Sequence, residues 1–115
     1  MTYRRSDRVN ALLQRELGTL ISEELEDPRI AFTTVTSVEV SPDLHTARVH
    51  VSVLADDAAA AGTMRALEDA KPHLRHELGQ RTELRFVPTL EFVADRSAER
   101  ATRISRLLRE VRRDG

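Results

Sequence analysis

The sequence predicts an α+β fold in which a three-stranded sheet carries its helices on one face. Three patterns predict this fold class. Apolar residues near the N-terminus recur at three- and four-residue spacing, as on an amphipathic helix. Two alternating, β-branched segments then follow each other across a short turn, as in a hairpin. A helical region broken by proline precedes a third alternating segment. The expected order is helix, strand, strand, helix, kink, helix, strand and a C-terminal helix.

The first helix is expected to begin at Asp7, with Ser6 as its N-cap, and to end before Pro28. Its apolar stripe consists of Val9, Leu12, Leu13, Leu17, Leu20, Ile21 and Leu25. A continuous stripe of this kind indicates a helix of about five turns that buries one face.

Residues 32–40 and about 45–54 are expected to pair as antiparallel strands across the turn Ser41-Pro42-Asp43. One face of the first strand is expected to carry Phe32, Thr34, Thr36, Val38 and Val40. One face of the second strand is expected to carry Ala47, Val49, Val51 and Val53. Both segments are rich in the β-branched residues that pleated, half-buried surfaces favour.

A helix is next expected over about residues 63–71, after the alanine-rich stretch 58–61. Pro72 interrupts this helix and is expected to start another, which ends at Gly79 as its C-cap. Residues 63–79 are therefore expected to form two short helices that meet at a kink.

The third strand is expected over about residues 84–93, with Pro88 favouring an edge position or a bulge. Its inward residues are expected to be Leu84, Phe86, Leu90 and Phe92. A last helix, capped by Asp95 or Ser97, is expected to bury Ile104, Leu107, Leu108 and Val111. Its outer face would carry Arg96, Arg100, Arg103, Arg106, Arg109, Arg112 and Arg113.

The 115 residues fit one domain over residues 1–115, with residues 1–5 and 112–115 expected to be mobile. The absence of cysteine excludes disulfides and thiolate metal sites. The sequence has no apolar run long enough for a signal peptide or a membrane span, so we expect a cytoplasmic protein without a membrane partner.

Charge is distributed unevenly along the chain. Residues 1–70 hold 7 basic and 12 acidic side chains, a balance of −5, whereas residues 71–115 hold 11 basic and 7 acidic ones, a balance of +4. This asymmetry fits a basic face that binds nucleic acid, and it fits solvated helix faces equally well. Aromatic residues are few, so base stacking on an aromatic-studded sheet is poorly supported.

Motifs for catalysis are missing: there is no glycine-rich phosphate loop, no G-x-S-x-G and no H-E-x-x-H. His73 and His76 could share a metal on a helix, but no third ligand is evident. The acidic run Glu23, Glu24, Glu26 and Asp27 could serve a small hydrolase, or it could simply be a charged helix end. We expect no enzyme activity, no cofactor, no metal and no small-molecule substrate.

The basic residues at the kink form the best binding candidate. They are Lys71, Arg75, Arg81 and Arg85. A helix N-terminus at the kink would add free N–H groups that suit a phosphate. The alternative is that Pro72 makes only a packing kink and the arginines are solvated.

Four blocks of the sequence resemble the ribosome-binding factor A family. They are Asp27-Pro28-Arg29-Ile30, the hairpin from Val40 to Val53, the kinked region from Ala66 to Arg81, and Leu84 to Phe92 with Asp95 and Ser97. The resemblance covers the chain from about Arg8 to Leu108.

This resemblance implies a type II KH-like domain without the usual G-x-x-G loop. The family's A-x-G kink corresponds to Ala70-Lys71-Pro72, so proline replaces glycine and removes an N–H. The implied partners are the immature bacterial 30S subunit and its 16S rRNA, with roles in late maturation, 5′-end processing and cold adaptation. The chain is expected to be a monomer when free; the alternative is a homodimeric protein–protein interaction module. The implied RNA contacts are Ala70, Lys71, Arg75, Arg81 and Arg85, with Arg4, Arg5 and Arg8 as further candidates.

Overall fold

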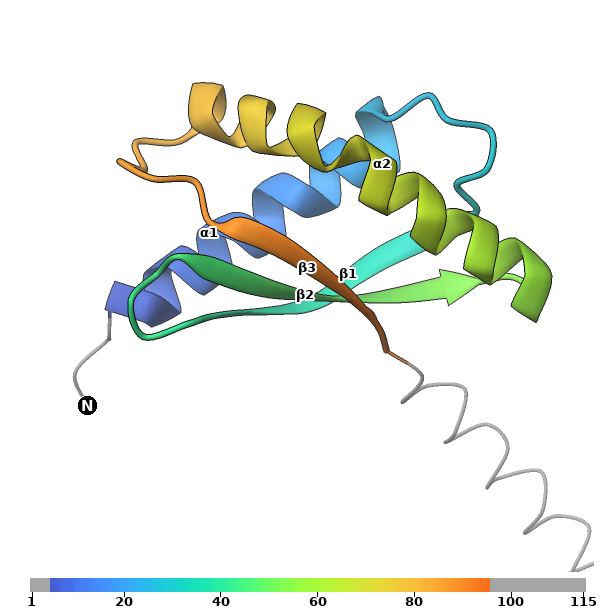
Figure 1. Ribbon diagram of the computed structural model, residues 1–115, viewed down its shortest axis with the longest axis horizontal. Coiled ribbons are helices and arrows are strands. Elements are labelled where there is room, and N and C mark those ends of the chain that lie inside the picture. The colour runs from blue at the N-terminus through green and yellow to red at the C-terminus, as the bar shows by residue number, and fades with distance from the viewer. Residues whose placement is uncertain (1–4, 96–115) are drawn as a thin grey trace, which may run out of the picture.

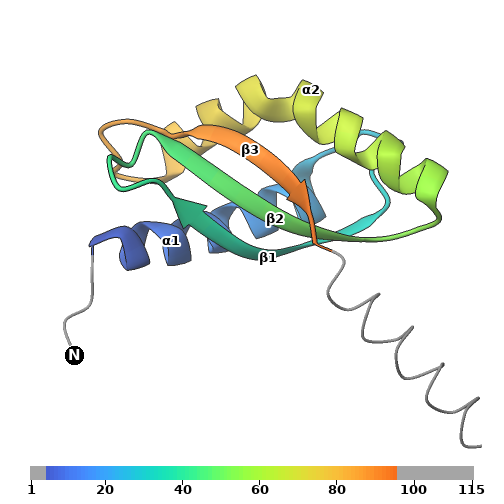
Figure 2. The same ribbon diagram turned by 60° about the horizontal axis from the view of Figure 1, so that its bottom comes forward.

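Two helices lie on one face of a three-stranded sheet in the computed structural model, which describes residues 5–95 (Figures 1 and 2). The elements follow the order α1 (Arg5–Thr19), the π-helical turn η1 (Leu20–Glu24), β1 (Phe32–Val40), β2 (Thr46–Leu54), α2 (Asp57–Arg81) and β3 (Thr89–Ala94). The strands are ordered β1-β2-β3, with β1 antiparallel and β3 parallel to β2. The predicted α+β class is confirmed. The predicted C-terminal helix lies outside the described residues.

The helix α1 and its continuation η1 bury most of the predicted stripe, but Leu25 is only partly buried and Leu12 does not belong to the core. The side chains of this segment in the core are Val9, Leu13, Leu17, Leu20 and Ile21. The Leu25 amide donates to the Leu20 carbonyl at 3.0 Å, a five-residue step that widens the last turn. The helix already includes Arg5, so the prediction that Ser6 is its N-cap is wrong. Helical geometry ends at Glu24 with the π-helical turn, before the end at Pro28 that the sequence predicts.

The strand β1 has the predicted bounds but not the predicted faces. The register passes from Val35 opposite Val51 to Ser37 opposite His50, which leaves Thr36 as an extra residue in a β-bulge. The bulge reverses the alternation, so Val35 and Val38 both face the core. The expectation that Phe32, Thr34 and Thr36 share a face with Val38 is therefore wrong. In β2 the expected inward residues Ala47, Val49 and Val51 are buried.

The helix α1 also covers the outer edge of the sheet at β1. The amide nitrogen of Val40 donates to the Asn10 side-chain oxygen at 2.8 Å. The Gln14 side-chain amide donates to the Thr36 carbonyl at 3.1 Å. These contacts satisfy backbone groups that an edge strand would otherwise leave unpaired.

The helix α2 is one helix rather than two. It begins at Asp57, six residues before the expected start, because the Asp56 side chain accepts a hydrogen bond from the Ala59 amide at 2.8 Å. Pro72 lies inside it and cannot donate to the Glu68 carbonyl, which favours a bend at this point. Figure 1 shows that the axis of α2 changes direction between its green and yellow parts. Gly79 is not the C-cap, because the helix continues to Arg81 and is capped by Thr82.

The strand β3 begins at Thr89, so residues 84–88 form a loop rather than the first half of a strand. Leu90 and Phe92 are buried as predicted, but Phe86 is 72% exposed and its predicted inward position is wrong. Pro88 cannot donate to a strand ladder and stands directly before β3, which is an edge strand. The core lies between the sheet and both helices, where Leu67, Leu74 and Leu78 of α2 are fully buried.

Candidate nucleic-acid interface

The cations at the predicted kink divide into two kinds by what neutralises them. Lys71 Nζ lies 2.8 Å from the Glu68 carboxylate and 6.0 Å from the centre of the Phe92 ring. Its charge is therefore balanced by a carboxylate on its own helix. Ala70 beside it is half-buried, whereas Pro72 is exposed. Position 72 has no N–H to offer to a phosphate, so the kink contributes shape rather than a backbone donor.

Arg81 is also neutralised by carboxylates. Its guanidinium pairs with Glu24 of η1 and with Glu77 of α2, the second at 3.3 Å. The hydrogen bond from Arg81 lowers the pKa of the Glu24 carboxyl below its ordinary value. Arg81 therefore joins the end of α2 to η1, and its charge is largely balanced within the protein.

Arg75 keeps its positive charge unbalanced. Its Nη2 donates to the Val87 carbonyl at 3.0 Å and its Nε to the Pro88 carbonyl at 3.2 Å. Carbonyl oxygens satisfy the donors of a guanidinium but carry no formal charge to cancel it. Arg75 thus fixes the loop after α2 and leaves a net cation beside it.

Arg85 lies in that loop, is exposed, and has no side-chain partner among residues 5–95. The loop also carries Glu83, so the local excess of positive charge comes from Arg75 and Arg85 together. Of the four cations predicted at the kink, these two are the ones whose charge is not balanced by a carboxylate of the described chain. They are the best placed to attract phosphate.

The loop at residues 82–88 packs against the turn between β1 and β2. The Thr89 amide donates to the His45 carbonyl at 2.8 Å. The rings of His45 and Phe86 meet edge to face, with centroids 6.3 Å apart and planes at 62°. Both views place this loop and the hairpin turn at the same end of the molecule, next to the start of α1 (Figures 1 and 2).

The N-terminal candidates belong to this end as well. Arg5 and Arg8 occupy the first two turns of α1 and are exposed, whereas Arg4 lies outside the described residues. Sequence reasoning missed Phe86 and His45 as surface residues here. The predicted third strand ran through Pro88, although a proline inside a strand is itself a sign that the strand begins after it.

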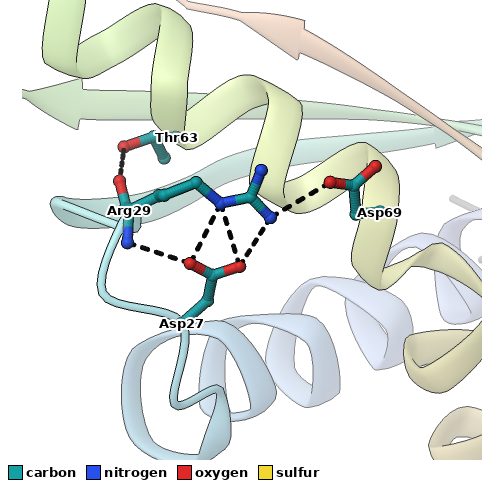
Figure 3. A network of polar contacts seen from close by, with 4 residues as sticks. All are labelled: Asp27, Arg29, Thr63 and Asp69. Atoms are coloured by element: carbon teal, nitrogen blue, oxygen red, sulfur yellow. Dashed lines mark hydrogen bonds and ion pairs between the residues drawn. The ribbon is translucent and has the colours of Figure 1, made fainter.

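A second polar network fixes the segment between η1 and β1 (Figure 3). The Asp27 carboxylate accepts hydrogen bonds from the Arg29 amide at 2.9 Å and from Arg29 Nη2 at 2.7 Å. The same Nη2 reaches Asp69 of α2 at 3.0 Å. These contacts lower the pKa of the Asp27 carboxyl and raise that of the guanidinium. Two carboxylates therefore balance Arg29.

Thr63 completes the network from the buried side. It is 0% exposed, and its hydroxyl oxygen accepts from the Ala31 amide at 3.0 Å. The carbonyls of Arg29 and Ala59 each lie 3.0 Å from the same hydroxyl as acceptors. The Asp27-Pro28-Arg29-Ile30 block is thus a structural fastening of this segment to α2.

The acidic run predicted as a possible hydrolase site does not converge on one site. Glu24 binds Arg81 and Asp27 binds Arg29, so the pKa values of both carboxyls are lowered. A general acid needs the opposite shift. His73 and His76 are exposed, and no group of three or more potential metal ligands occurs within residues 5–95.

No helix in the described part of the chain is long and apolar enough to cross a membrane. A groove of about 540 Å³ lies between α1 and β1. Its lining includes Gln14, Gly18, Ser22, Phe32 and Thr34, which offer no nucleophile with an adjacent base.

Comparison with known proteins matches the ribosome-binding factor A family model to residues 5–108. Ribosome-binding factor A from each of two strains of Desulfitobacterium hafniense is 46% identical over 114 residues, which is 99% of this chain and 91% of the relative.

Solved structures agree with the sequence comparison. The crystal structure of ribosome-binding factor A from Thermus thermophilus has a TM-score of 0.72 at 34% identity, covering 80% of this chain and 97% of that one. A homology model of the Thermus thermophilus factor, fitted into the cryo-electron microscopy map of a 30S–RbfA complex, has a TM-score of 0.57 at 34% identity. It covers 74% of this chain and 93% of that one.

Proposed function

The chain belongs to the ribosome-binding factor A family, and on this premise we propose that it binds the immature 30S subunit through 16S rRNA and has no catalytic activity of its own. The relative fitted into a 30S complex supports the choice of partner. The observation that carries RNA contact is the pair Arg75 and Arg85, whose charges no described carboxylate balances. Cations in this state release counterions when they meet phosphate.

The finer role follows from the family rather than from the geometry. We infer that binding promotes late maturation of the subunit in the cytoplasm, including processing of the 5′ end of 16S rRNA and growth in the cold. The element order is compatible with a type II KH-like domain, and we propose that one such domain spans residues 1–115 and is a monomer when free. The proline at position 72 would then replace a backbone contact with a bend.

The first test is co-sedimentation with 30S subunits at low and at physiological salt. Arg85→Glu should weaken binding by about ten-fold and reduce its salt dependence, because one phosphate contact is lost and one repulsion is added. It should leave the melting temperature unchanged, since Arg85 is exposed and holds no described partner. This single variant is sharper than reversing all four cations, because Arg75 and Arg81 also hold the fold together.

Arg15→Glu is the matched control. Arg15 is exposed on α1, with 73% of its side chain accessible, and pairs with the adjacent Glu16 at 3.7 Å. The control should bind subunits like the parent protein. Equal loss in both variants would mean that net charge alone governs binding, and normal binding of Arg85→Glu would exclude the proposed surface.

A homodimeric interaction module is the second candidate, and one observation favours it. Phe32 and Leu54 face each other across the ends of β1 and β2 and are 72% and 78% exposed. Adjacent exposed apolar side chains often mark protein contacts. A molecular mass that rises with concentration, together with no affinity for 30S subunits, would favour this function over RNA binding.

A further inference from the structure

We propose that Phe86 and His45, flanked by Arg85, form a stacking site for one unpaired RNA base. This inference rests on the proposed RNA-binding function and adds to it the kind of nucleotide that is recognised. Stacking is tolerant of sequence because every base has an aromatic face, but it requires a base that is not paired in a helix. The site would therefore select single-stranded rRNA over duplex.

The loop that carries the exposed ring of Phe86 is fastened at both ends. It is held on one side by the Arg75 hydrogen bonds to the Val87 and Pro88 carbonyls, at 3.0 and 3.2 Å. On the other side the Thr89 amide bonds to the His45 carbonyl at 2.8 Å. Pro88 is fully buried, which anchors the end of the loop. Because the loop is already ordered, stacking a base on Phe86 costs little backbone conformational entropy.

The ring is also available. Phe86 is 72% exposed, and the His45 side chain is 71% exposed. The two rings meet edge to face, so they do not cover each other as a parallel stack would. The Asp43 carboxylate beside them bonds to the Ser41 hydroxyl at 2.6 Å and to the His45 amide at 3.0 Å. Its other oxygen lies 3.8 Å from His45 Nδ1, so the contacts of Asp43 all lie within the hairpin turn, and its negative charge remains beside the site.

Two arginines lie next to Phe86 and favour RNA over a protein partner; the nearby carboxylates of Glu83 and Asp43 pair with neither of them. Arg85 is adjacent in the chain, and Arg75 lies beneath the loop without a carboxylate partner. Phe32 is equally exposed, but Arg15, which lines the same groove, pairs with Glu16. Of these two exposed phenylalanines, Phe86 is the one that combines a stacking face with unbalanced cations. That combination is typical of single-strand binding surfaces.

The test uses the full chain and fluorescence anisotropy with a labelled oligouridylate of about ten nucleotides, with a duplex RNA of the same length as the comparison probe. Phe86→Leu should weaken binding to the single strand by about ten-fold without changing the salt dependence, because a stacking contact and not a phosphate contact is lost. Phe86→Trp should retain binding. Phe32→Leu is the control, since it removes a phenylalanine of the same 72% exposure.

The outcomes separate this inference from the proposed function. If the parent protein binds 30S subunits and Phe86→Leu binds the single strand equally well, the stacking site is wrong and the proposed function stands. If Phe86→Leu loses subunit binding but keeps its affinity for the oligonucleotide, Phe86 contacts a protein, and the inference is overturned. If the parent fails to bind subunits yet binds single strands through Phe86, the stacking site stands and the proposed function fails.

Discussion

Two segments of this protein are each fastened to α2 by an arginine, and they differ in what receives its charge. The segment before β1 uses Arg29, which binds carboxylates at Asp27 and Asp69. The loop before β3 is held by Arg75, which binds the carbonyls of Val87 and Pro88. Both arrangements position a loop. Only the second leaves a positive charge that no carboxylate of the described residues balances. That charge is available to a phosphate.

The comparison shows why counting arginines predicts binding poorly. The arginine of the Asp27-Pro28-Arg29-Ile30 block looks as suitable for RNA as any other until its partners are known. Carboxylates hold it in a planar, two-pronged geometry, and an ion pair of this kind would have to be broken to bind phosphate. A cation's partner, more than its exposure, separates a structural arginine from a binding one.

The strongest way to break the first fastening is Thr63→Val. This change keeps the side-chain volume but leaves the partly buried Ala31 amide without its acceptor. We expect a loss of about 1–3 kcal/mol in the free energy of unfolding, because the amide loses its partner beside the buried Thr63 side chain. Thr63→Ser keeps the hydroxyl and should lose clearly less. Chemical denaturation measures both, and RNA binding of the folded variant should be unchanged if this segment is purely structural.

The second fastening is tested by Arg75→Met and Arg75→Lys. The methionine variant loses both carbonyl contacts and the charge, so we expect about 1 kcal/mol of destabilisation together with weaker RNA binding. The lysine variant keeps the charge but not the forked geometry, so it should retain the salt dependence of binding while the loop exchanges its amides faster. Hydrogen exchange at residues 82–87 measures the loop. Unchanged exchange in both variants would show that Arg75 does not fasten it.

Much of the fold was predictable from the sequence because its signals are local. The alternating pattern predicted both ends of β1 correctly, and it predicted the start of β2 one residue too early. The apolar stripe of α1 named the side chains that enter the core. These patterns need only short-range periodicity, and the core that they build is the usual one for helices on a sheet.

The errors came from features that depend on distant partners. The bulge at Thr36 is not marked by glycine or proline, and the Thr36 hydroxyl bonds to the His50 carbonyl at 3.2 Å and to Asp95 at 2.8 Å. The early start of α2 depends on the Asp56 cap, which the alanine run obscured. The binding candidates were chosen by charge, but which of them are balanced depends on contacts such as Arg81 with Glu24, 57 positions apart.

The smallest expected effect concerns acid and the first fastening alone. The hydrogen bonds from Arg29 hold the pKa of the Asp27 carboxyl below its ordinary value in the folded state. The contribution of this carboxylate to stability is therefore complete above the ordinary aspartate pKa of about 3.9 and is lost as the pH falls through the lower folded value. Asp27→Asn should melt below the parent at neutral pH, and the gap should narrow in acid.

Arg29→Gln should give the same narrowing. The double variant should lose less stability than the sum of the two single variants, because both changes remove the Asp27–Arg29 pair. Arg29→Gln also removes the contact with Asp69. Thermal melting at neutral pH and near pH 3 measures these differences. The loop held by Arg75 to carbonyls contains no titrating partner, so Arg75→Met should keep the same gap at both pH values. If the difference in melting temperature between Arg75→Met and the parent also narrowed in acid, the two fastenings would not differ in their electrostatics. The contrast between carboxylate and carbonyl partners would then be wrong.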